Sequence, residues 1–406
     1  MVDVKQQYGC EAIAQLAEDD ASTDSLHAAG AIERVVAALL IHRGDARVQI
    51  AGLQAVKFLA ESPVIRPHLC QLGAGEAIVA AMRQHTQNEY IQLRAARAMH
   101  AVLCDGNEST RARLVKAHAF TPLTSALIRH TGTRNMFTLN IVAHLIADLL
   151  DDETCAALTG AGVEALLAAL TAAGATAAVT GPCLAAIVKL CCGGAGLAAE
   201  LATDGACDAV MACARSCGGD PTVHACAWGA VASLCRDAGN VARLGARGAC
   251  EALGAVLRDH ATCQQIQLAG VAAARQLAMH DGNAARLAAV GCCEAVVAAM
   301  NLCHGDADMQ QMAVSAIAML AGSQQRAAQF GVPGCWAVLS AVRAFPLDDV
   351  IQQRGNRAML ALCSLDSNNR WLERTELAAE EDGAADDSRQ ESAFAATDAG
   401  STETSA

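Results

Sequence analysis

The fold is decided by one stretch of sequence that recurs along the chain, Gly30-Ala31-Ile32-Glu33-Arg34-Val35-Val36-Ala37-Ala38-Leu39. Its apolar residues have the spacing of a helix that opens just after a glycine. Equivalent openings begin at Gly73, His118, Ala161, Gly205, Gly248, Gly291 and Gly334. The period is therefore about 43 residues, and such a period with only helical patterning predicts a solenoid of helix pairs or triplets.

Each repeat contains three predicted helices. In the first repeat they cover residues 32–42, 47–60 and 63–72, and the middle helix is the longest. Its apolar residues, from Val48 to Leu59, follow helical spacing. The long helix recurs at Ile91, Val179, Val223, Ile266, Met309 and Ile351. Its equivalent near Asn135 is shifted by a residue or two.

Capping residues support these boundaries. Asp220 is a predicted N-cap, because Pro221 follows it at the first helical position. The same place before other long helices, where a cap is predicted, is held by Asp45, Thr262, Asp306 and Asp348. The glycines at the openings stand where one helix stops and the next starts at a sharp angle, a place that favours positive φ.

The two ends of the chain differ from the repeats. Residues 1–29 match the back half of a repeat, and we interpret them as a partial N-terminal repeat. Because an open solenoid end exposes apolar surface, we expect upstream sequence or an N-terminal partner. The predicted array spans 30–377 and closes with an amphipathic capping helix over 369–377. Residues 378–406 are acidic and rich in Ser, Thr and Ala, which predicts a disordered tail.

Composition limits the class of protein. Apolar residues make up 53% of the chain and aromatic residues only 3%, which predicts a core of small side chains between closely packed helices. The net charge of −13 argues against nucleic-acid binding. The longest uncharged stretch, 165–188, is interpreted as two buried helices, so no membrane insertion is expected. Nineteen cysteines without a secretory signal favour free thiols in a reducing compartment. We expect a cytoplasmic protein, with nuclear access left open.

Several stretches match one family pattern. They are Gly30-Ala31-Ile32, Val48-Gln49, Ala55-Val56 with Leu59, Ile266-Gln267-Leu268-Ala269 and, more loosely, Met309-Gln310. On these residues the chain resembles the armadillo-repeat family over about residues 1–377. Its finer sequence pattern is similar to that of the armadillo region of large leucine-rich-repeat kinases. The resemblance implies an all-α, right-handed α-solenoid of about eight three-helix armadillo repeats plus the partial N-terminal repeat. It also implies that the long helices line a concave groove.

The resemblance does not extend to peptide importers. In those armadillo proteins a Trp and an Asn, one turn apart on the long helix, clamp an extended peptide. The Asn position here holds Phe58, Ala101, His144, Lys189, Ser233, Gln276, Met319 and Ala361. The Trp position holds Gln54, Arg97, Asn140, Ala185, Gly229, Ala272, Ser315 and Arg357. Because neither residue occurs at its position, importin-type binding of nuclear signals is not expected.

Polar residues at the predicted groove positions are candidates for binding a protein or peptide ligand. Arg94 with Arg97, and Arg354 with Arg357, are predicted basic pairs one turn apart. The other candidates are Asn140, His144, Lys189, Arg275 and Gln276. We hypothesise that the groove takes an acidic or mixed helix or an extended peptide, with the arginines as bidentate anchors. The alternative is a solvated helix face whose arginines pair with neighbouring acids.

Other chemistry finds little support in the sequence. A column twelve residues after the openings contains His42, His85, His130, Cys217, His260 and Cys303. Packed helices lie about 10 Å apart and zinc ligands about 2 Å from the ion, so we expect no metal site and interpret the column as polar helix ends. No catalytic motif or zinc-type cysteine pairing occurs, so we expect no cofactor and no enzyme. The predicted function is a non-catalytic scaffold or adaptor that binds protein partners through the groove. The alternative is a regulatory armadillo fragment of a larger signalling protein such as a kinase.

Overall fold

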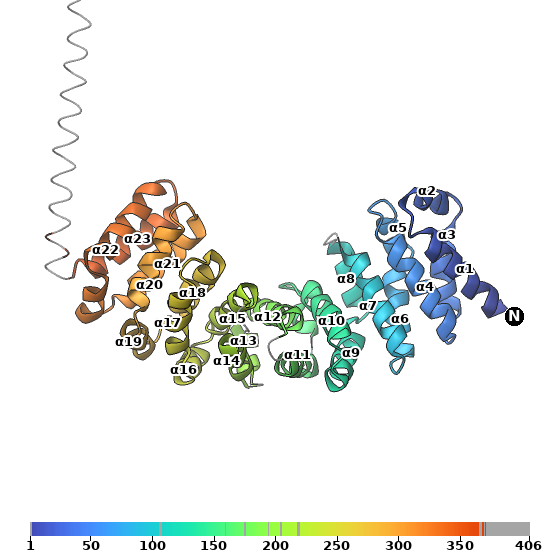
Figure 1. Cartoon of the computed structure of the whole chain (residues 1–406), viewed down its shortest axis with the longest axis horizontal. Helices are drawn as coiled ribbons and strands as arrows, with labels where there is room; N and C mark the ends of the chain where they lie inside the picture. Colours follow the sequence, from blue (N-terminus) through green and yellow to red (C-terminus); the bar gives the residue numbers. More distant parts are fainter. Residues whose placement is uncertain are drawn as a thin grey trace, which may run out of the picture. The chain divides into compact units, whose positions relative to one another are not determined.

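A computed structural model describes residues 2–370, apart from 105–107, 159, 174–175, 194, 204, 217–219, 365–367 and 369. These residues form twenty-three α-helices and one short 3-10 helix, and they contain no strand (Figure 1). The chain divides into two compact units, Met1–Ala249 and Cys250–Ala406, and each is described by itself. The predicted all-α class is confirmed.

The first unit stacks three-helix repeats so that like helices pack against like. Its long helices, each in contact with the next, are α1 (Val2–Leu16), α4 (Ala46–Leu59), α7 (Glu89–Leu103), α10 (Met136–Leu149), α12 (Ala177–Cys192) and α15 (Pro221–Leu234). The opening helices are α3 (Ala31–Ile41), α6 (Ala74–Gln84), α9 (Phe120–Thr133), α11 (Gly160–Ala173) and α14 (Ala206–Ser216). The short helices are α2 (Asp20–Ala28), α5 (Arg66–Gln71), α8 (Glu108–Lys116), α13 (Ala195–Thr203) and α16 (Ala238–Ala246). One repeat has only the 3-10 turn η1 (Cys155–Ala157) in the place of a short helix.

The second unit continues the same order of helices. They are α17 (Ala249–Asp259), α18 (Gln264–Leu277), α19 (Asp281–Ala289), α20 (Cys292–Leu302), α21 (Ala307–Leu320), α22 (Gln324–Ala344) and α23 (Asp349–Leu362). Helix α22 joins a short and an opening helix across a kink at Gly331, where φ is 50°. The opening predicted at Gly334 is therefore three residues late, because Pro333 fits only the first turn of a helix and the break must precede it.

The other predicted turns are mostly confirmed. Positive φ occurs at Gly30, Gly73, Gly205, Gly248 and Gly291. His118 adopts the same left-handed conformation with φ 57° although it is not glycine. The Arg83 guanidinium donates hydrogen bonds of 2.9 and 3.1 Å to the carbonyls of Ala117 and His118, which hold this turn against the strain.

The predicted N-caps are right with one exception. The Asp45 carboxylate accepts hydrogen bonds from the amides of Arg47 and Val48. The same capping is made by Asp220, Asp306 and Asp348. Thr262 was predicted to cap α18, but Cys263 holds that position and its side chain makes no capping bond. The prediction fails because a one-residue shift in the linker moves the threonine out of the N-cap geometry.

A glutamine, buried in four of the five cases, ties each of five long helices to the opening helix before it. The Gln267 amide Nε2 donates to the carbonyls of Leu257 (2.9 Å) and His260 (3.0 Å). The same pair of bonds, to carbonyls ten and seven residues back, is made by Gln49, Gln92, Gln310 and Gln352. These carbonyls belong to the ends of the opening helices, which have no partner inside their own helix. The glutamine thus fixes the corner of each repeat.

Small residues bring the two helices of a repeat close together. A Cβ atom on Gly52 would lie 2.7 Å from Leu39 Cδ2, and one on Gly270 would lie 2.6 Å from Leu257 Cδ2. Both distances are far below van der Waals contact, so only glycine fits without a shift of the neighbour. The core is otherwise built from buried Ala, Leu, Val and Cys, as predicted.

The long helix of the third repeat, α10, lies in a different frame from the one predicted. The N-cap Asn135 and the burial of α10 place His144, not Asn140, at the position of Arg97. Helices α1 and α2 occupy the places of a long and a short helix, and α1 packs on α4. The capping helix over 369–377 and the tail 378–406 lie outside the described residues, except for 370. Among the described helices none alone meets the length and apolarity needed to cross a membrane, and one bent pair, α19 with α20, meets them on length and composition.

Candidate functional site

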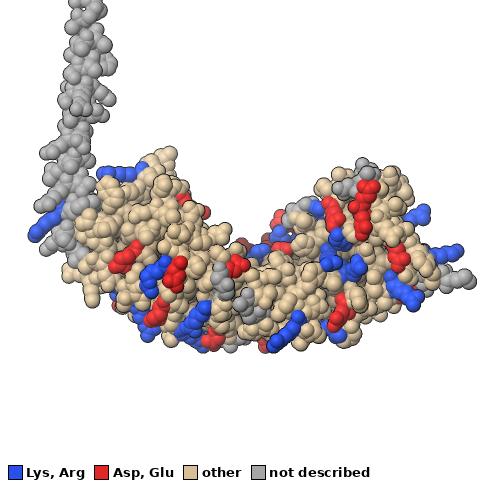
Figure 2. Space-filling view, in the orientation of Figure 1, with Lys and Arg blue, Asp and Glu red and all other residues tan. Residues whose placement is uncertain are grey.

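The long helices α4, α7 and α10 border a pocket of about 620 Å³ in the first unit. It is lined by Lys57, Ala60, Glu61, Arg66, Arg97, His100, Ala101, Cys104, Asn140, Ile141 and His144. Figure 2 shows Lys and Arg side chains gathered on this unit near α7 and α8. Three of the predicted candidates, Arg97, Asn140 and His144, are thus brought together in one pocket.

The basic side chains of this pocket are held in place by their neighbours. The Arg97 guanidinium lies over the Phe137 ring at 4.7 Å from its centroid. Lys57 Nζ lies 3.9 Å from the centroid of Phe58 and 2.5 Å from the Glu61 carboxylate. Stacking leaves the guanidinium N–H groups in the plane of the group free to bind an oxyanion. The cationic side chains of Arg97 and Lys57 are therefore held in fixed positions in the pocket.

Asn140 supplies a polar group that the pocket does not satisfy. Its Oδ1 atom is buried and has no hydrogen-bond partner among the described residues. The His144 ring, at Nδ1, makes a 2.9 Å hydrogen bond to the Asn140 carbonyl, so the imidazole is fixed on its own helix. A buried unpaired amide oxygen costs about 1–3 kcal/mol.

Arg94 and two exposed aromatic residues extend this surface beyond the pocket. Arg94 lies one turn before Arg97 on α7, is partly buried, and forms no ion pair with a described residue. Tyr90 and Phe137, near the starts of α7 and α10, are 72% and 51% exposed. Tyr and Arg are the residue types that most often dominate the energy of protein interfaces.

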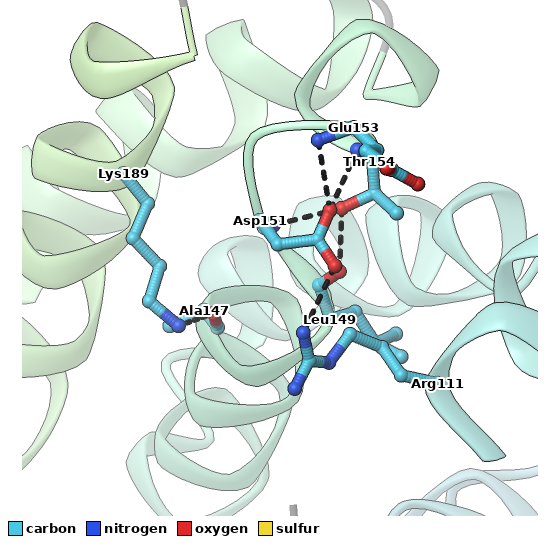
Figure 3. Close-up of polar contacts among 7 residues, drawn as sticks. All are labelled: Arg111, Ala147, Leu149, Asp151, Glu153, Thr154 and Lys189. Carbon is cyan, nitrogen blue, oxygen red and sulfur yellow. Dashed lines mark hydrogen bonds and ion pairs between the residues drawn. The ribbon is translucent and has the colours of Figure 1, made fainter. Parts of the chain in front are cut away.

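Lys189, another predicted candidate, serves a structural contact in the first unit. Its Nζ donates a 2.7 Å hydrogen bond to the Ala147 carbonyl at the end of α10 (Figure 3). Beside it, Asp151 forms a 2.9 Å ion pair with Arg111 and accepts from the amides of Glu153 and Thr154. Burial raises the pKa of Asp151, but the hydrogen bonds from Arg111 and Thr154 together outweigh it and hold that pKa at about 2. This cluster anchors the loop that replaces a short helix.

The remaining candidates, Arg275, Gln276, Arg354 and Arg357, lie on long helices of the second unit. Arg354 donates a 3.0 Å hydrogen bond through Nη1 to the Ser315 hydroxyl. Arg275 is partly buried, and its Nε atom has no hydrogen-bond partner among the described residues. Gln276 is partly buried, whereas Arg357 is exposed. Sequence reasoning missed Ser315 as part of this group, because a small residue at the Trp position gave no signal by itself.

Comparison with known proteins identifies the fold. No family model and no curated protein matches the chain. A chain from a solved structure that concerns a conserved phosphorylation switch in the interaction between cadherin and beta-catenin is similar to this chain, with a TM-score of 0.71 and 16% identity. The match covers 86% of this chain and 70% of that chain. This chain has an armadillo-type fold.

Two further solved structures are similar to part of the chain. A designed armadillo repeat protein is 21% identical with a TM-score of 0.47, over 56% of this chain and 92% of its own. An engineered protein is 20% identical with a TM-score of 0.48, over 57% of this chain and 91% of its own. The finer resemblance to the armadillo region of leucine-rich-repeat kinases finds no support in these comparisons.

The armadillo repeats use the histidine and cysteine column for structure. His42 and His85 are C-caps of opening helices, and their carbonyls accept from Gln49 and Gln92. His130 departs from the predicted helix end: it is fully buried inside α9, and burial lowers the pKa of its imidazole. Cys217 lies outside the described residues. Within the part of the chain that the structure describes, no three His, Cys, Asp or Glu side chains are placed to hold a metal ion.

Proposed function

We propose that this armadillo protein is a non-catalytic scaffold that binds a protein partner through the surface of α4, α7 and α10. The observation that carries the proposal is the pocket of about 620 Å³, around which Lys57, Arg97, His100 and His144 converge. Pockets of this size with a few convergent polar groups are the usual places where proteins hold ligands. Armadillo proteins of known structure include one described through its interaction with cadherin, which gives the proposal a precedent in another protein.

The chemistry of the pocket favours an acidic segment as the ligand. One acid, Glu61, lines it beside Lys57, whereas Arg97 stacks on the Phe137 ring and forms no ion pair with a described residue. A carboxylate reaching Arg97 would form a bidentate pair, the strongest form of charge-assisted hydrogen bond. The exposed rings of Tyr90 and Phe137 would cover apolar parts of the same segment.

The proposal of binding without catalysis rests on the sequence, in which no catalytic motif occurs. We also propose a reducing compartment, the cytoplasm, since the eighteen cysteines that the structure describes are all free thiols.

Charge reversal at the pocket tests the proposed function. The double variant Arg94→Glu, Arg97→Glu should lose a distinct set of partners in quantitative affinity capture, with a drop of roughly tenfold or more for direct contacts. Arg34→Glu is the matched control, because Arg34 is exposed on the opening helix α3. Identical partner sets for the double variant and the wild type would refute the proposal.

A further inference from the structure

Two arginines on one surface of the second unit have no acidic partner. Arg275 lies on α18 and Arg354 on α23, the two long helices that flank α21. Neither takes part in an ion pair among the described residues. Guanidinium groups that are partly buried without a counter-charge are costly, so their occurrence in a pair calls for a ligand that supplies the charge.

The register of the long helices aligns these two residues with Ser315. Counted from the N-caps Cys263, Asp306 and Asp348, Arg275 is at position 12, Ser315 at position 9 and Arg354 at position 6. A step of three residues is nearly one helical turn, so the three positions form an oblique line across three adjacent helices.

The first unit shows that this oblique line brings side chains together. Positions 12, 9 and 6 on α4, α7 and α10 hold Lys57, Arg97 and Ile141, and these three residues line the same pocket. The same register therefore places Arg275, Ser315 and Arg354 around one point in the second unit. The 3.0 Å hydrogen bond from Arg354 to the Ser315 hydroxyl confirms half of this line directly.

The contacts of Ser315 and Arg275 show how the two guanidinium groups are held. The Ser315 hydroxyl donates to the Gln311 carbonyl at 2.7 Å, so its oxygen is left to accept from Arg354 and fix that guanidinium. Arg275 keeps a buried Nε without a hydrogen-bond partner. Burial, and secondarily the charge of Arg354, lower the pKa of Arg275, in agreement with the register that places the two cations near each other.

Asp348, the acid whose pKa Arg354 affects, does not neutralise the two arginines. Arg354 contributes to lowering the pKa of Asp348, but only behind the hydrogen bonds that this carboxylate accepts. Asp348 accepts from the amides of Val350 and Ile351 and from Gln311 Nε2, all at 2.9–3.0 Å. Its oxygens are thus occupied as the N-cap of α23.

We propose that Arg275 and Arg354, with Ser315 as a positioning residue, form a binding site for a phosphate group carried by a peptide partner. Two cations call for two negative charges, and a phosphate monoester carries −1.5 to −2 at neutral pH, whereas a carboxylate carries one. Arginine forks match phosphate oxygens in bidentate geometry. The site lies on the second unit and stands independently of the pocket proposed for partner binding in the first.

The test titrates the full chain with inorganic phosphate at pH 7.5 and constant ionic strength, and follows the arginine Nε–Hε signals by NMR. The Arg275 signal, assigned from its loss in Arg275→Lys, should shift saturably. Arg354→Gln should weaken phosphate binding by roughly tenfold or more, and Ser315→Ala by a few-fold. Arg343→Gln is the matched control, because Arg343 is exposed on α22, outside the three helices. It should change the affinity less than about twofold.

Three outcomes would overturn the proposal: no saturable shift of the Arg275 signal, an equal loss of affinity in Arg343→Gln, or an equal shift with acetate at the same concentration. A neutral peptide with one phosphoserine should produce the same shift, and its unphosphorylated form should not. Arg275→Lys keeps the positive charge at this position, so the variant used to assign the signal is expected to stay folded. The variant Arg94→Glu, Arg97→Glu should retain the phosphate response, so a failure of either proposal is recognised separately.

Discussion

Replacing Gln267 by methionine should loosen one corner of the second unit without disturbing its surface. Gln267 is 2% exposed, and its amide bridges the end of α17 to α18. Methionine has similar length and fills the same space, but it cannot donate a hydrogen bond. The substitution therefore isolates the two hydrogen bonds from the packing.

The magnitude follows from what each carbonyl loses. The His260 carbonyl keeps a hydrogen bond from the Cys263 amide at 3.0 Å, so it loses one of two donors. The Leu257 carbonyl loses the donor that Gln267 provides at 2.9 Å and is left buried. One lost hydrogen bond and one unsatisfied buried carbonyl together cost about 2–4 kcal/mol.

Hydrogen exchange measured by mass spectrometry is the suitable assay, because repeat arrays unfold locally and a single global unfolding energy is not well defined. Peptides from α17 and α18 should lose protection by ~30-fold to ~900-fold, the factors that correspond to the expected free energy. Gln265→Met is the control, since Gln265 is exposed two residues away on α18. Unchanged exchange in Gln267→Met, or equal loss in both variants, would refute the assigned role.

Three further predictions concern local chemistry. His130 is buried, and burial lowers its pKa below the usual 6.5. The unfolded chain therefore takes up a proton first, so the stability of α9 should fall as pH drops below about 6.5. His130→Leu should flatten this dependence in the hydrogen exchange of α9 peptides at pH 7.5 and 5.5, corrected for intrinsic rates, and an unchanged dependence would contradict the assignment. The pKa of Asp151 is lowered to about 2, so the stability that its carboxylate contributes is present above the ordinary aspartate pKa of 3.8 and is lost as pH falls toward 2. Asp151→Asn should lower the local stability of residues 150–158 by about 1–3 kcal/mol at neutral pH and so speed their hydrogen exchange. Equal exchange in both proteins would contradict this. Cys263→Asp should supply the missing cap of α18 and stabilise its first turn by about 0.5–2 kcal/mol, seen as slower exchange there, whereas faster exchange would show that the aspartate does not cap.

The sequence predicted those features of the fold that depend on local chemistry. Glycine at a left-handed turn and aspartate at an N-cap act through their own backbone and the next few residues, so Gly30 and Asp45 could be placed correctly without the rest of the chain. Gly334 failed for the same local reason, since Pro333 sets where the turn must fall. The alignment of α10 with the other long helices could be assigned only from its N-cap, Asn135, and from the pattern of its buried residues.

What the sequence did not predict depends on contacts between distant residues. Gln267 matched a family pattern, yet its role is defined by carbonyls seven and ten residues away across a corner. Lys189 was a groove candidate by register, but the Ala147 carbonyl from the neighbouring repeat occupies its ammonium group. Arg97 lines the pocket, and the Phe137 ring on which it stacks comes from the next repeat. Register therefore gives the surface on which a side chain lies, and only packing shows whether it is free to bind.

The long helices separate the residues that hold the repeat from those that can bind. Position 4 after the N-cap holds the buried glutamines, such as Gln267 and Gln310, which tie each corner. Positions 6, 9 and 12 face the neighbouring long helices; there Arg97 is exposed, Arg354 is partly buried and Ser315 is buried. Since the two sets occupy different positions on one helix, substitutions at exposed residues such as Arg97 should change the chemistry of the proposed binding surface without removing the glutamine contacts that fix each corner. This separation explains how the armadillo frame is kept here while the Trp and Asn positions of peptide importers carry other side chains.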